Sequence, residues 1–126
     1  MNIRISVIPH SAQRYDTVGD WFYDADGTLI ICVSRMWNWK YECLVALHEL
    51  VEVLLCEDRG ITQQAVDDFD KAFEAAREPG NEDEPGDDPA APYRKEHFFA
   101  TNIEALMSAE YGVNWQEYEK KIEALP

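Results

Sequence analysis

The sequence predicts an α+β fold in which a small antiparallel sheet of two or three strands precedes about four helices. Two observations support this prediction. Before residue 36, apolar side chains alternate with polar ones or form short β-branched runs, which is typical of strands. After residue 38, apolar side chains recur every three or four positions, which is typical of amphipathic helices. The 126 residues are expected to form a single domain, 1–126, with a core that needs no disulfide.

Three segments are expected to form the sheet. Residues 3–8 alternate between apolar and polar side chains until Pro9 ends the run. Residues 21–23 and 28–34 flank the sequence Asp-Ala-Asp-Gly at 24–27, and Asp-Gly between two β-rich runs predicts a hairpin. Because residues 28–34 are apolar on both faces, we expect them to form a central strand.

Four helices are expected to follow. Asn38, Thr62 and Asn114 can cap helix starts, because their side chains accept hydrogen bonds from the first unpaired amides. Gly60 and Gly112 suit the left-handed backbone that ends many helices. The expected helices therefore span about 39–56, 63–77, 93–111 and 115–125.

Two further expectations concern the third helix and the segment before it. Within the helix at about 93–111, Phe99, Ile103 and Leu106 are spaced to share one face, and we expect that face to pack inward. Residues 79–92 hold four of the six Pro and five acidic residues. We expect them to form a mobile acidic loop, because such a composition buries little apolar surface.

The net charge of the chain limits the classes of ligand and partner that it can bind. The chain has 25 acidic and 11 basic residues, and its formal net charge is −14. This balance excludes direct nucleic-acid binding, which needs a basic face, and leaves a peptide or protein substrate or a basic protein partner. No apolar run is long enough to cross a membrane, and the N-terminus does not resemble a signal peptide. Three Cys without a CxxC pair fit reduced thiols, so we expect a cytoplasmic location.

The expected helix at 39–56 carries a polar stripe within an otherwise apolar sequence. His48 and Glu52 are four residues apart and share a face, and Glu49 and Glu52 are three residues apart. Ionisable groups on a buried helix are costly unless they are paired or bind a metal. The stripe therefore predicts either a metal site or a buried network of hydrogen bonds.

The expected helix at 93–111 offers a second pair of candidate ligands, Glu96 and His97. If the two helices pack side by side, His48 and Glu52 could meet this pair at one point. Imidazole nitrogens and carboxylate oxygens suit Zn²⁺ best, and they also suit Mn²⁺ or Fe²⁺. The sequence thus predicts a metal centre between the two helices.

The segment His48-Glu49-Leu50-Val51-Glu52 resembles the His-Glu-x-x-His motif of zincin metallopeptidases. The resemblance implies that His48 is the first zinc ligand and that Glu49 is the general base for a zinc-bound water. Glu52 stands where the family has its second His. A carboxylate at that position lowers the power of the metal to acidify bound water, so the resemblance implies a hydrolase or a descendant that kept only the metal.

A second resemblance concerns residues 96–100, which are similar to the third-ligand helix of ImmA/IrrE-type zincins. It implies that Glu96 or His97 is the third ligand. The chain as a whole resembles small proteins of the kind that bacteriophages encode, which would place it in the cytoplasm of a bacterial host.

Two alternatives remain open at the level of sequence. Glu49-x-x-Glu52 followed by Asp67-x-x-Asp70 resembles the paired acidic motifs of MazG-type nucleotide pyrophosphohydrolases, which implies Mg²⁺ binding by four carboxylates. The high negative charge also fits an acidic inhibitor, similar to those of phages, that covers the basic surface of a nucleic-acid-binding protein.

Overall fold

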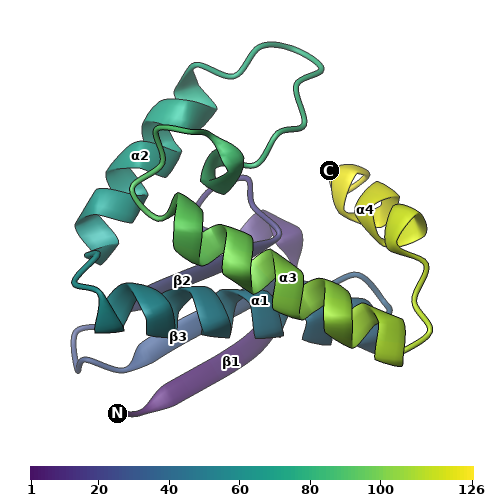
Figure 1. Ribbon diagram of the computed structural model, residues 1–126, viewed down its shortest axis with the longest axis horizontal. Coiled ribbons are helices and arrows are strands. Elements are labelled where there is room, and N and C mark those ends of the chain that lie inside the picture. Colours follow the sequence, from purple (N-terminus) through teal and green to yellow (C-terminus); the bar gives the residue numbers. More distant parts are fainter.

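The computed structural model describes residues 1–126 and confirms the α+β class. In Figure 1, helix α1 lies across the sheet and helix α3 lies over α1. The elements in chain order are strand β1 (Ile3–Ile8), the short 3₁₀ helix η1 (His10–Ala12), strands β2 (Gly19–Tyr23) and β3 (Leu29–Ser34), helices α1 (Trp39–Asp58) and α2 (Gln63–Ala75), the short 3₁₀ helix η2 (Pro85–Asp87), and helices α3 (Arg94–Glu110) and α4 (Trp115–Glu123).

The sheet has the strand order β1-β3-β2 and is mixed, where the sequence led us to expect antiparallel pairing throughout. β2 and β3 form the expected antiparallel hairpin, and β3 is central. β1 pairs with β3 in parallel, with Ile3 opposite Leu29. Alternation of side chains predicts which face is buried but not the direction of pairing. The direction follows from the order of the strands, because the chain passes from β1 to the far edge strand β2 and the hairpin then places β3 between them, parallel to β1.

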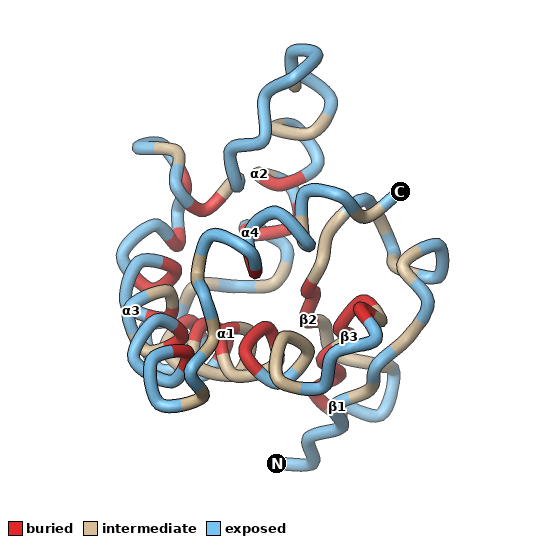
Figure 2. Tube along the Cα trace, turned by 90° about the vertical axis from the view of Figure 1, so that its right-hand side faces the viewer, coloured by how far each residue is buried: buried red, intermediate tan, exposed pale blue.

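The hydrophobic core lies between the sheet and α1. Figure 2 shows buried residues along β2, β3 and α1, whereas most of the loop after α2 is exposed. β1 contributes little to this core, because Ile3 and Ile5 remain 44 % and 48 % exposed. The residues that form the core cluster are Trp21, Leu29, Ile31, Val33, Met36, Leu44, Val45, Val53, Cys56, Val66, Ala91, Tyr93 and Tyr118.

The helix ends follow the capping residues of the sequence. The side chains of Asn38, Thr62 and Asn114 accept hydrogen bonds from the first turns of α1, α2 and α4. Gly60 follows α1 with a φ of 70°, a backbone conformation that glycine adopts without strain. None of the helices combines the length and the apolar character that a membrane span requires.

Helix α3 turns inward a different face from the one we predicted, and of the three residues expected to pack inward only Ile103 is even partly buried. Phe99 and Leu106 are 50 % and 66 % exposed. The reason lies in α1, whose polar stripe forms the surface that α3 covers and needs polar partners there. The buried residues of α3 are accordingly Glu96, His97, Ala100, Glu104 and Ser108.

This orientation predicts a small effect of substitution at Leu106. Leu106→Ala should change the free energy of unfolding by less than about 0.5 kcal/mol, because the side chain is mostly in water already. Leu44→Ala, in the core, should cost about 2–5 kcal/mol and serves as the control. Urea denaturation measures both. A loss of 2 kcal/mol or more in Leu106→Ala would contradict the outward orientation of this face.

The segment between α2 and α3 contacts the rest of the molecule at several points. Gly86 and Ala91 are buried, although most of their neighbours are exposed. Glu84 and Asp87 extend toward the ring of His97 on α3. The acidic segment therefore lies against the same helix that supplies the predicted metal ligand.

Candidate metal centre

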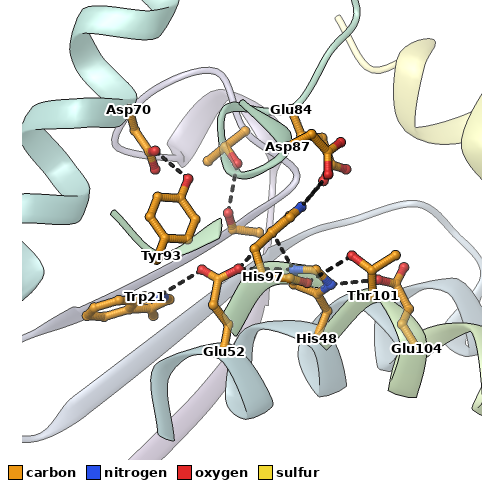
Figure 3. A network of polar contacts seen from close by, with 12 residues as sticks. Trp21, His48, Glu52, Asp70, Glu84, Asp87, Tyr93, His97, Thr101 and Glu104 are labelled. Atoms are coloured by element: carbon orange, nitrogen blue, oxygen red, sulfur yellow. Dashed lines mark hydrogen bonds and ion pairs between the residues drawn. The ribbon is translucent and has the colours of Figure 1, made fainter. Parts of the chain in front are cut away.

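Three predicted ligands meet between α1 and α3. Nε2 of His48 lies 3.1 Å from Oε2 of Glu52, and Nδ1 of His97 lies 2.9 Å from the same oxygen. The two ring nitrogens are 3.1 Å apart. All three side chains are buried, and Figure 3 shows how they point toward one another. These residues form a group that could hold a metal ion.

The spacing of the three atoms fits a tetrahedral cation. Zinc lies about 2.0–2.1 Å from its nitrogen and oxygen ligands, which places neighbouring ligand atoms about 3.3 Å apart. The distances of 2.9 to 3.1 Å among His48, Glu52 and His97 are close to this value. The chain offers three ligand atoms here, so a tetrahedral metal would keep a fourth position for water, as in catalytic zinc sites.

A second layer of residues fixes the orientation of His48. Its Nδ1 lies 2.7 Å from Oε1 of Glu104, while Oε2 of Glu104 accepts a hydrogen bond from the hydroxyl of Tyr118. A carboxylate that accepts the Nδ1 proton leaves Nε2 free to bind a metal, and such pairs are common around metal-bound His. Trp21 donates to Oε1 of Glu52 and so directs Oε2 toward the two rings.

Sequence reasoning placed Glu104 on the same helix face as His97 without assigning it a contact, and it missed the roles of Tyr118 and Trp21. Of these three residues, only Glu104 could have been linked to the site from the sequence, because it lies seven residues after His97 and therefore on the same face of the helix. Tyr118 and Trp21 come from elements far away in the sequence, and no spacing connects them to the motif.

Electrostatics show how strongly these groups interact. Burial opposes the charged form of His97, but its contacts with Glu52 and then Glu84 outweigh burial and raise the pKa of His97 to about 10. Burial also opposes the charged form of Glu52, but His48 and His97 lower its pKa to about 2. If both rings are protonated, their N–H groups face each other at 3.1 Å. A cation that replaces those protons removes this repulsion.

Glu49 lies beside the three ligands and lines the same cavity of about 420 Å³. Its side chain runs against Gly19 of β2 so closely that a Cβ on Gly19 would lie 2.5 Å from Oε1 of Glu49. Glycine at this position therefore makes room for the carboxylate. Burial, followed by the charge of Glu52, raises the pKa of Glu49 well above its usual value.

The structure does not bring Glu96 into this group. Its carboxylate accepts a hydrogen bond from Arg59 at 2.6 Å and links the start of α3 to the end of α1. Glu96 and His97 are adjacent on a helix and point about 100° apart, so they cannot both reach the same point.

The four carboxylates of the pyrophosphohydrolase alternative line one cavity, but they do not converge on a single point. Asp67 is held by Arg14, which also forms two hydrogen bonds to Asp20. Asp70 accepts hydrogen bonds from the hydroxyls of Tyr15 and Tyr93. Neither aspartate belongs to a group of potential metal ligands that includes Glu49 or Glu52.

The buried carboxyl group of Asp70 should make the free energy of unfolding depend on pH. Burial raises its pKa from 3.8 to about 6, although the hydroxyls of Tyr93 and Tyr15 act in the opposite direction. The folded chain thus holds this proton more tightly than the unfolded chain. The stability that Asp70 provides is complete below about pH 4 and is lost as the pH rises through about 6, a change of about 3 kcal/mol.

Asp70→Asn should remove this change. The stability of the variant relative to the wild type should therefore increase by up to about 3 kcal/mol between pH 4 and pH 7.5, measured by urea denaturation. Asp68→Asn, on the exposed side of α2, is the matched control and should show no such trend. A pH-independent difference between Asp70→Asn and the wild type would contradict the assignment.

The cavity beside the ligands is strongly acidic. Of its lining residues, twelve are Asp or Glu, whereas the basic ones are Arg77 and the two ligand candidates His48 and His97. Arg77 is already paired with Glu74. A ligand of this cavity would gain from carrying positive charge.

Comparisons of the chain with protein-family models, with curated proteins and with solved structures find no match.

Proposed function

We propose that this protein is a zinc-dependent hydrolase of the zincin type, with His48, Glu52 and His97 as its metal ligands. One observation carries the proposal. Two imidazole nitrogens and one carboxylate oxygen, from helices about fifty residues apart in sequence, converge within 3.1 Å of one another. Mn²⁺ or Fe²⁺ would also suit this set of ligands.

The composition of the ligand set supports retained activity. Glu52 replaces the second His of the motif, but His97 supplies a second imidazole from α3. The resulting set of two His and one Glu is the set found in several zinc peptidases. Glu52 therefore need not weaken the metal centre as much as the motif alone suggests.

Glu49 is the general base of the proposed reaction. The bound metal would acidify a water molecule and polarise the substrate carbonyl. The Glu49 carboxylate would accept the proton of that water and later transfer it to the leaving amine. A raised pKa suits this role, because a base that must also return the proton works best near the working pH.

We propose a basic peptide as the substrate. The excess of acidic side chains around the cavity attracts Lys and Arg and repels acidic chains. The same charge fits the alternative of a basic protein that binds without being cleaved. Hydrolysis of Lys- and Arg-containing peptides would support the first function, and stable binding without hydrolysis would support the second.

Metal content tests the proposal. Protein purified without a metal-binding tag is loaded with Zn²⁺, freed of excess ion by gel filtration and analysed by elemental mass spectrometry. We expect at least one zinc per chain in the wild type and one fewer in His48→Ala. Equal zinc content in the two proteins, with the fold of the variant verified by circular dichroism, would contradict the proposed site.

A further inference from the structure

The second nitrogen of His97 has carboxylates beside it but no hydrogen bond with good geometry. Nε2 is buried and makes no hydrogen bond. Nevertheless, it lies 2.9 Å from Oε2 of Glu84 and 3.2 Å from Oδ1 of Asp87. Figure 3 shows these two carboxylates on the side of the ring away from His48. A buried polar atom without a hydrogen bond calls for an explanation, such as an ion.

The geometry around Nε2 is that of ligands around a common cation. Carboxylate oxygens at these distances would accept a hydrogen bond if they lay along the N–H direction, and neither does. A metal lies on the nitrogen lone pair, and its other ligands lie to the side of that axis. Glu84, Asp87 and His97 accordingly form a second group that could hold a metal ion.

The backbone of the acidic segment is shaped to this ring. A Cβ on Gly86 would clash with Cγ and Nδ1 of His97, so only glycine lets the chain pass at this distance. Gly86 lies between Glu84 and Asp87 in sequence. Its close approach brings both carboxylates to Nε2.

We propose that Glu84, Asp87 and Nε2 of His97 form a second divalent-cation site that shares His97 with the first site. The inference rests on the proposed function for the ion at Nδ1. The second cation takes the place of the Nε2 proton, which is released to solvent, so that His97 bridges the two ions as an imidazolate. One nitrogen and two carboxylate oxygens suit Zn²⁺ or Mn²⁺.

The second cation has a structural consequence for the cavity. Glu84 and Asp87 lie in the segment before α3, and residues 78–86 of this segment line the cavity next to the first site. An ion bound to both carboxylates fastens the segment to α3. The wall of the cavity then depends on the occupancy of the second site.

Zinc stoichiometry in four proteins tests this inference. At saturating Zn²⁺, equilibrium dialysis with elemental analysis should give two ions per chain for the wild type, one for His48→Ala, one for Asp87→Asn and none for His97→Ala. Asp87 is exposed, so Asp87→Asn should not disturb folding. Asp88→Asn is the matched control and should keep both ions.

The outcomes separate the two proposals. One ion in the wild type and in Asp87→Asn, with none in His48→Ala, would overturn the second site and leave the first intact. One ion in the wild type and in His48→Ala, with none in Asp87→Asn, would overturn the first site and the bridge. For the bridge itself, Cu²⁺ in both sites should give a weaker electron paramagnetic resonance signal than two isolated ions, because an imidazolate couples their spins. A signal of full intensity would overturn the bridge.

Discussion

Glu49→Gln should leave the zinc content unchanged and lower the hydrolysis of Lys- and Arg-containing peptides by about 10²- to 10⁴-fold. The reason is that Gln fills the same space beside Gly19 but cannot accept a proton from bound water. Steady-state rates with quenched fluorescent peptides measure the effect. Zinc content is determined on the same samples, so that loss of metal and loss of the base are distinguished.

Asp58→Asn provides the control for this prediction. Asp58 is an exposed acid at the end of α1, and its neutralisation changes the net charge by the same amount. It should retain the wild-type rate. Equal rates for Glu49→Gln and the wild type would rule out Glu49 as the base, and loss of zinc in Glu49→Gln would assign it to the metal ligands instead.

Glu104→Ala should have the second largest effect. The substitution removes the acceptor of His48 Nδ1 and of the Tyr118 hydroxyl in a buried place. We expect zinc affinity to fall about 10- to 100-fold, because the imidazole loses the partner that orients it. Each unpaired buried group should also cost about 1–3 kcal/mol of folding stability. Competition with a chelating dye measures the affinity, and urea denaturation measures the stability.

Two variants make this prediction specific. Tyr118→Phe removes one hydroxyl but leaves the contact between Glu104 and His48, so its effect on zinc affinity should be smaller. Glu104→Gln keeps an oxygen for Nδ1 and should recover part of the affinity. If Glu104→Ala binds zinc as tightly as the wild type, Glu104 does not orient the ligand.

Much of the architecture could be predicted from local sequence. Asn38, Thr62 and Asn114 act within a few residues of their own position, so the helix starts follow directly from their chemistry. The apolar run at residues 28–34 likewise identified the central strand, because burial on both faces leaves a composition that can be recognised in sequence.

Features that depend on partners distant in sequence could not be predicted. The apolar residues Phe99 and Leu106 satisfy the usual rule for an inward face, yet α3 turns them outward because α1 presents ionisable groups to it. Glu96 and Glu104 are both plausible partners for His48 in sequence. Arg59 engages the first, and only the packing of the two helices shows that the second reaches His48.

The residues that could bind the ion are the same residues that hold α1 and α3 together. His48 and Glu52 on one helix meet His97 and Glu104 on the other, and Ala100 is the small apolar residue between them. Such an interface buries little apolar area, so the hydrophobic effect holds α3 only weakly. The polar contacts of the site therefore contribute much of what holds α3 in place, and amide hydrogen exchange along α3 should report on site occupancy. Binding of the proposed ion at the first site would thus also stabilise the fold of this part of the chain.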